Sequence, residues 1–167
     1  MNAIDPTKFV VLWAVTAVGA FVTGAVMRRA RRLPFFKPAF DAPQFNENWC
    51  SGASDRGLLG SLGLARNCLW IVVTADELRI GPHFPFNLFY LPFVLDLDVT
   101  VSTETIVSVE ETRSLFKGDY LRVTYEAADP GGVVVRTRHL DLQPKRREAL
   151  ARLLQEKLRL RKTGPAS

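Results

Sequence analysis

Nineteen consecutive residues near the start of the chain, Phe9 to Met27, carry no charge, and arginines follow them directly. At about 1.5 Å per residue, a helix of this length reaches roughly 28 Å, close to the ~30 Å hydrocarbon core of a bilayer. A cleavable signal peptide carries its basic residues before a shorter apolar core. A buried core helix seldom runs this long without a polar face. We therefore favour a retained single-pass transmembrane helix over these two alternatives.

Charge on the two sides of this segment predicts its orientation. Asp5 and Lys8 precede it, whereas four arginines and Lys37 follow it. Basic residues flanking a transmembrane helix stay on the cytoplasmic side. We predict a cell-membrane protein, in an inner or plasma membrane, with its N-terminus outside and everything after Met27 cytoplasmic. The expected division is a tail over 1–8, the transmembrane helix over 9–27, a basic linker over 28–45, a folded domain over 46–162 and a tail over 163–167.

The formal net charge of +5 is distributed unevenly along the chain. Residues 28–40 carry +5, residues 41–142 hold 14 acidic against 8 basic residues, and residues 143–167 carry +6. A nucleic-acid-binding domain carries its basic residues on the folded body, so we expect no nucleic-acid partner. Anionic lipid headgroups attract a basic arm beside a membrane by about 1 kcal/mol per charge. The basic C-terminal segment either joins that contact or pairs with the acidic body.

The linker combines basic residues with phenylalanines and prolines, which disfavour both helix and strand. Aromatic rings settle near lipid headgroups, where basic side chains also reach. The candidate membrane or partner contacts in this linker are Arg28, Arg29, Arg31, Arg32, Phe35, Phe36 and Lys37. An extended linker whose rings pack on the folded domain is an equally weighted alternative.

Residues 41–67 carry no clear period, and we expect them to be irregular. Within them Gly57, Gly60 and Gly63 recur among leucines, which favours a short helix over a phosphate-binding loop. From Cys68 onward the pattern becomes β, with alternating apolar residues and turn signals. The expected strands cover 69–74, 78–80, 97–101, 106–112, 120–127 and 133–142, with a turn at Asp129–Gly132. A closing helix over 144–161 has an apolar stripe of Leu150, Leu153, Leu154 and Leu158.

Three stretches of this β region carry a resemblance. They are residues 74–80 (TADELRI), 99–111 (VTVSTETIVSVEE) and 118–125 (GDYLRVTY). The chain from Cys68 to about Leu158 resembles bacterial pleckstrin-homology-like (PH-like) and GRAM-like domains. The resemblance implies a bent antiparallel barrel of six or seven strands, with one end plugged by an amphipathic C-terminal helix. Phosphoinositide-binding members use a basic cluster around the first hairpin, where this chain offers only Arg79, so that activity is not carried over.

An aromatic stretch from Phe84 to Phe93 interrupts the strands and contains two prolines. One interpretation is an apolar surface that dips into the bilayer interface or grips a partner. The other, which we favour, is that these rings fill the barrel core or its mouth. The candidate contacts in this stretch are Phe84, Phe86, Phe89, Tyr90 and Phe93.

The sequence offers no catalytic constellation, so we expect no enzymatic activity, no cofactor and no metal. His83 and His139 are interpreted as surface or packing residues, and Cys50 and Cys68 as reduced packing residues. Asp96 and Asp98 share one face of a strand, which suits a hard cation only weakly without further oxygen ligands.

Together these patterns predict a non-catalytic PH-like interaction or scaffold module at the cytoplasmic membrane surface. A domain that binds a lipid or hydrophobic ligand is the alternative, and an enzyme comes third. A protein partner in or at the membrane is expected. Ala20 and Gly24 form a small-xxx-small pair that suits helix dimerisation, and self-association stays open.

Overall fold

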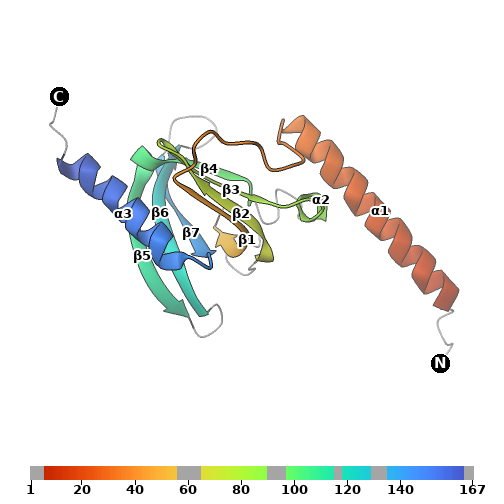
Figure 1. Cartoon of the computed structure of the whole chain (residues 1–167). Coiled ribbons are helices and arrows are strands. Elements are labelled where there is room, and N and C mark those ends of the chain that lie inside the picture. Colours follow the sequence, from red (N-terminus) through yellow and green to blue (C-terminus); the bar gives the residue numbers. More distant parts are fainter. Residues whose placement is uncertain (1–5, 56–64, 90–96, 115–117, 129–134, 164–167) are drawn as a thin grey trace.

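The computed structural model describes residues 6–55, 65–89, 97–114, 118–128 and 135–163. These residues form a long N-terminal helix, an extended arm over 33–44 and a sheet domain with a C-terminal helix. Figure 1 shows the N-terminal helix leaving one side of the sheet domain, with the C-terminal helix on the opposite side. The start of α1 and the end of the C-terminal helix therefore lie far apart.

Helix α1 (Pro6–Ala30) has 25 residues, which corresponds to a length of about 37 Å. Among the described residues it is the one helix long and apolar enough to cross a membrane. Its large apolar side chains from Phe9 to Val26 are exposed rather than packed into the sheet domain. The helix expected over 9–27 is confirmed as a helix, and it continues through the first two arginines.

The sheet has seven antiparallel strands in the order β4-β3-β2-β1-β7-β6-β5. The strands are β1 (Phe45–Ser54), β2 (Ala65–Val73), β3 (Glu77–Pro82), β4 (Val99–Ser102), β5 (Ile106–Ser114), β6 (Gly118–Ala128) and β7 (Val135–Gln143). The remaining elements are α2 (Phe86–Phe89), the 3-10 turn η1 (Thr103–Thr105) and α3 (Arg147–Thr163). Because β1 pairs with both β2 and β7, it joins the two halves of the sheet.

The expectation of irregular structure over 41–67 holds for residues 41–44 but is wrong for residues 45–54 and 65–67. Strand β1 occupies Phe45–Ser54, and β2 begins at Ala65 rather than near Cys68. Two register shifts interrupt the pairing of β1 with β2, and a charged residue, Glu47, takes an inward position beside Phe45. The bulges and the buried charge hide the period-2 pattern, so neighbouring strands rather than local sequence define this strand.

The core lies between the curved sheet and α3. Leu121, Val123 and Tyr125 of β6 all point into it, as their alternation predicted. From α3, Leu150 and Leu154 are fully buried, while Leu153 and Leu158 pack at the margin. The apolar stripe is thus confirmed, although the helix begins at Arg147 and not at Pro144.

The other expected strands have counterparts within a few residues of their predicted ends. Several sequence predictions fall outside the described residues. These are the glycines at 57, 60 and 63, the turn at 129–132, and the side chains of Phe89, Tyr90, Phe93 and Asp96.

Candidate functional site

Helix α1 ends in a tight reversal that turns the chain back toward its own last turn. The N–H of Arg32 donates to the carbonyl of Arg29 at 3.1 Å, and the N–H of Leu33 donates to the carbonyl of Arg28 at 2.9 Å. These two bonds define a Schellman motif, whose reversing position usually holds glycine. Here Arg32 occupies it with φ 56°. The helix therefore stops at a fixed place, and the arm leaves in a fixed direction.

Arg28 joins α1 to the sheet domain. Its side chain is only 2% exposed, and its guanidinium donates to both carboxylate oxygens of Asp98, at 2.5 and 3.3 Å. It also donates to the carbonyl of Pro34. Arg28 was a candidate membrane or partner contact, but here it pairs with a carboxylate of its own chain, because the helix reversal brings the domain against its side chain.

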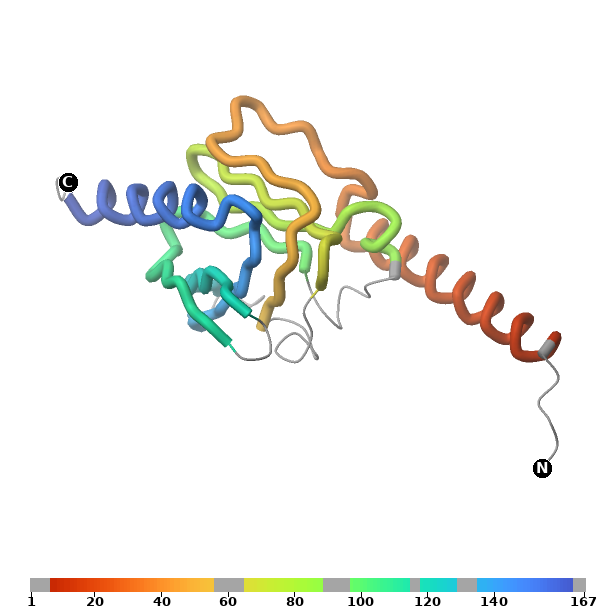
Figure 2. The backbone as a smooth tube through the Cα atoms, turned by 60° about the horizontal axis from the view of Figure 1, so that its bottom comes forward, coloured from red at the N-terminus to blue at the C-terminus, as the bar shows by residue number. Residues whose placement is uncertain are grey.

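A close approach of two backbones completes this junction. A Cβ added at Gly24 would lie 2.0 Å from the carbonyl oxygen of Leu88 in α2, so only glycine fits there. Leu88 itself is 1% exposed. The face of α1 that carries Gly24, considered above for helix dimerisation with Ala20, is used here by α2 of the same chain. Figure 2 shows α2 beside the last turns of α1.

The arm is fastened along the outer face of the sheet domain. Asn87 of α2 donates to the carbonyl of Phe35 at 2.6 Å, and Lys37 donates to the side chains of Asn46 and Asn48. The ring of Phe40 lies 5.8 Å from that of Trp70. The packing interpretation of the linker thus holds for Phe40, whereas Phe35 and Phe36 are exposed.

Exposed aromatic side chains gather around this junction. Outside α1, the exposed aromatic residues with described side chains are Phe35, Phe36, Trp49, Phe84 and Phe86, and we call them the aromatic platform. The rings of Phe36 and Phe84 lie 5.2 Å apart, which links the arm to the turn before α2. Phe84 and Phe86 lie outside the buried core, because their side chains are 43% and 38% exposed.

Trp49 is a member of this platform that sequence reasoning missed. It sits at the first register shift of β1 with φ 60°, and its ring stacks on His83 at 4.5 Å with the planes 19° apart. A bulge of this kind redirects a side chain, here outward toward solvent. The only sequence signal was a tryptophan among polar residues, because neither the bulge nor the contact is local.

Two titratable groups beside the platform, His83 and Lys37, have pKa values below their ordinary values. Burial, together with the positive charge of Lys37, lowers the pKa of His83, so its ring is neutral at pH 7. Burial also lowers the pKa of Lys37, against an opposing effect of Cys50. A neutral imidazole stacks on Trp49 without the cost of a buried charge.

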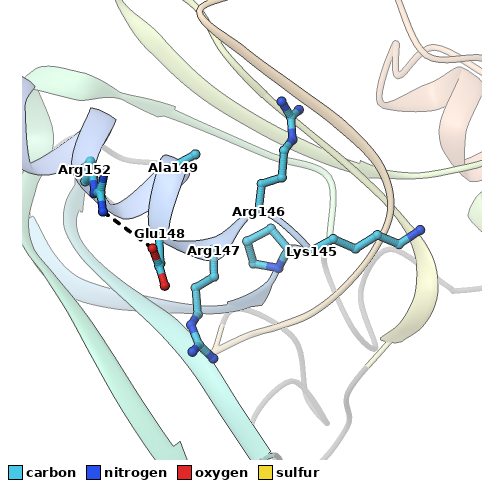
Figure 3. Close-up of a pocket in the computed structure, with 7 residues that line it drawn as sticks. Lys145, Arg146, Arg147, Glu148, Ala149 and Arg152 are labelled. Atoms are coloured by element: carbon cyan, nitrogen blue, oxygen red, sulfur yellow. Dashed lines mark ion pairs between the residues drawn. The ribbon is translucent and has the colours of Figure 1, made fainter.

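A second candidate site is a hollow of about 550 Å³ at the start of α3, with basic side chains around it (Figure 3). Intrachain carboxylates pair with its three arginines. Arg146 pairs with Glu47 at 3.3 Å, Arg147 with Glu111 and Asp119 at 3.7 Å, and Arg152 with Glu148 at 3.6 Å. This arrangement leaves little net positive charge for an anionic ligand.

Glu47 also accepts hydrogen bonds from backbone N–H groups at the start of α3. Its carboxylate accepts the N–H groups of Lys145 and Arg146. Burial on its own raises the pKa of Glu47, but these hydrogen bonds and those from Cys50 and Arg146 outweigh it, so the pKa lies below the ordinary value. The basic C-terminal segment thus pairs with the acidic body, as one of the two alternatives proposed.

The remaining candidate residues have structural partners. Cys50 and Cys68 are both buried, and burial with the neighbouring Glu47 charge raises the pKa of Cys50 to about 12, which makes it unreactive. The backbone N–H of His139 donates to Asp55, and its ring contacts Thr124. Asp98, considered for a cation, is paired with Arg28. Within the described ranges, no three metal-ligating side chains come together.

Most predicted contact residues thus lie at one end of the molecule. Arg29, Arg31 and Arg32 are exposed beside the platform, Lys37 is half-buried, and Arg28 is buried. Comparisons with protein-family models, with curated proteins and with solved structures give no match for this chain. The class that the fold defines is a seven-stranded antiparallel domain with a C-terminal helix, joined to a long exposed apolar helix.

Proposed function

We propose that this chain is a single-pass membrane protein whose PH-like domain acts as a non-catalytic interaction or scaffold module at the cytoplasmic surface of the cell membrane. The observation that carries the proposal is the exposed apolar surface of α1, which ends where Arg28 and Gly24 fasten the helix to the domain. Such an apolar surface is unfavourable in water, and a bilayer removes that cost. A domain fastened to the helix is then held at the membrane.

The strand order supports the PH-like part of the proposal. One group of strands runs β4-β3-β2-β1 and the other β7-β6-β5, and α3 packs across the core between them. The resemblance implied six or seven antiparallel strands followed by one C-terminal helix, and the seven strands and α3 agree with that count and order. A scaffold of this kind hosts many functions, so the proposal assigns it interaction and not a reaction.

Orientation rests on the exposed arginines. Arg29, Arg31 and Arg32 stand on the domain side of the apolar segment, and basic residues near a span stay cytoplasmic. The domain then faces the cytoplasm, where its two buried cysteines stay reduced.

A topology experiment tests this proposal on the full chain. A reporter fused after Ser167 should read as cytoplasmic, and the protein should resist extraction from membranes by alkaline carbonate. Replacing Arg29, Arg31 and Arg32 by glutamine should weaken the orientation, whereas replacing Arg152, Arg159 and Lys162 by glutamine should leave it unchanged. A reporter that reads as extracytoplasmic, or a protein released by carbonate, contradicts the proposal.

The alternative of a hydrophobic-ligand domain rests on a cavity lined by the rings between Phe84 and Phe93. The described members of that set, Phe84 and Phe86, face outward. Tyr90 and Phe93 lie outside the described residues. No observation favours this second function over the first, and we do not propose it.

A further inference from the structure

The aromatic platform draws its members from three segments far apart in the sequence. Phe35 and Phe36 come from the arm, Trp49 from the bulge of β1, Phe84 from the turn that leads into α2, and Phe86 from the start of α2. The chain brings them together through the Phe36–Phe84 ring contact, the stacking of Trp49 on His83 and the Asn87–Phe35 hydrogen bond. The exposed large hydrophobic residues described elsewhere on the domain are aliphatic and scattered: Val107, Val135 and Leu160.

The depth of the platform follows from where α2 meets α1. Leu88 touches Gly24, which belongs to the uncharged segment and precedes Arg28 by four residues. At about 1.5 Å per residue, this contact lies roughly 6 Å to the apolar side of Arg28 along the helix. When α1 spans a bilayer, α2 therefore sits at the boundary between headgroups and acyl chains.

We propose that the aromatic platform inserts into this interfacial layer and forms a second membrane contact of the domain, beside the α1 span. The proposal rests on the membrane anchoring proposed above and adds the lipid surface as the ligand of a particular face. Phenylalanine and tryptophan rings partition to the headgroup level, and Arg29, Arg31 and Arg32 stand beside them to meet anionic phosphates.

The structure favours a lipid surface over a protein partner for this face. The platform adjoins the end of the apolar helix through the contact of α2 with Gly24, and exposed arginines follow that helix, a combination typical of membrane-interface residues. The ring of Trp49 is exposed, and its backbone adopts a left-handed conformation that is unfavourable for a tryptophan. The fold therefore holds this ring outward at a cost in conformational free energy. Insertion fixes the domain on the membrane, with α3 on the side away from α1 and open to the cytoplasm (Figure 1).

A labelling experiment on the full chain tests the insertion. Single cysteines replace Phe86, Phe36 or Leu160, carry an environment-sensitive fluorophore, and are reconstituted into vesicles of phosphatidylcholine and phosphatidylglycerol. Lipids with a nitroxide near the headgroup quench fluorophores at that depth. The unsubstituted chain gives the background, because Cys50 and Cys68 are buried. Leu160 is the matched control, since it is exposed on α3 at the far side.

We expect quenching at Phe86→Cys and Phe36→Cys to be several-fold stronger than at Leu160→Cys. Equal quenching at the three positions would overturn the inference. A fourth variant, Val15→Cys in the middle of α1, reports on the span itself through a nitroxide deep in the acyl chains. Quenching at Val15 without quenching at Phe86 and Phe36 contradicts the platform contact but not the membrane anchoring by α1. Absence of quenching at Val15 contradicts the membrane anchoring as well.

Discussion

Arg28 at the end of α1 and Asp98 just before β4 form a bidentate ion pair, at 2.5 and 3.3 Å, across 70 positions of sequence. Neither side chain has much access to water, with exposures of 2% and 12%. A charge left alone in such a place loses its hydration without compensation. The pair therefore links the position of α1 to the fold of the sheet domain.

Replacing Asp98 by asparagine should destabilise the full chain by about 3–5 kcal/mol, because it leaves the Arg28 charge buried without a counter-ion. Urea unfolding in detergent micelles measures the free energy of unfolding. Glu77→Gln is the control, since it removes an ion pair with Arg79 whose side chains are more than a third exposed. Such exposed pairs contribute only about 0–1 kcal/mol. Equal losses in the two variants would contradict a buried pair.

Replacing Gly24 by alanine should separate α1 from α2. The added Cβ would stand 2.0 Å from the carbonyl oxygen of Leu88, a backbone atom that cannot turn aside. Hydrogen–deuterium exchange should become faster at the amides of Asn87 and Leu88, whose bonds to His83 and Pro85 hold this turn together. Gly19→Ala, where nothing lies within 4 Å of the added atom, should leave their exchange unchanged. Slow exchange in both variants would argue against the close approach.

The cap of α3 by Glu47 predicts a pH dependence of stability. The pKa of Glu47 is lowered in the folded state, so its contribution is complete above the unfolded value near 4.5 and is lost as the pH falls through the folded value. Thermal unfolding between pH 7 and pH 3 should show this loss in the natural chain and a smaller one in Glu47→Gln.

At pH 7 the same Glu47→Gln variant should be less stable by about 1–3 kcal/mol, because a side-chain N–H₂ group then faces backbone donors. Glu148→Gln, which changes an exposed carboxylate of the first turn of α3, is the matched control and should shift stability little. An identical pH profile in the natural chain and Glu47→Gln would show that the cap carries no linked proton.

Neighbouring residues of α2 should respond differently to truncation. Leu88→Ala removes a fully buried side chain and should cost about 2–5 kcal/mol of unfolding free energy. Phe86→Ala removes a ring that is 38% exposed and should cost clearly less. Thermal unfolding of both variants in micelles measures the difference. A larger loss of stability in Phe86→Ala than in Leu88→Ala would indicate that the ring of Phe86 belongs to the core.

Much of the secondary structure was predictable because its signals are local. The alternation of Leu121, Val123 and Tyr125 predicted one buried face of β6, and the leucine spacing predicted the buried side of α3. Strand β1 was missed because Glu47, its inward charged residue, is satisfied only by the backbone of Lys145 and Arg146, which lies about a hundred positions away. A buried charge breaks any hydrophobic pattern, and its partner is invisible from the neighbouring residues.

The candidate site was predictable in composition and not in arrangement. The basic and aromatic residues of the linker and of the 84–93 stretch stood out from the sequence. Which of their side chains are buried and which are exposed could not be predicted from it. The Schellman reversal at Arg32 decides that Arg28 turns inward while its neighbouring arginines stay exposed. Trp49 joined the platform only through a bulge and a stacked histidine.

By itself the sequence determined a long uncharged helix with basic residues after it, a β-rich domain and an amphipathic closing helix, because period and charge act over a few residues. Only the tertiary structure decided that Arg28 pairs with Asp98, that Gly24 admits α2, that Phe36 contacts Phe84 and that Trp49 stacks on His83. Those contacts join residues tens of positions apart, and their free energy exists only once the chain has folded.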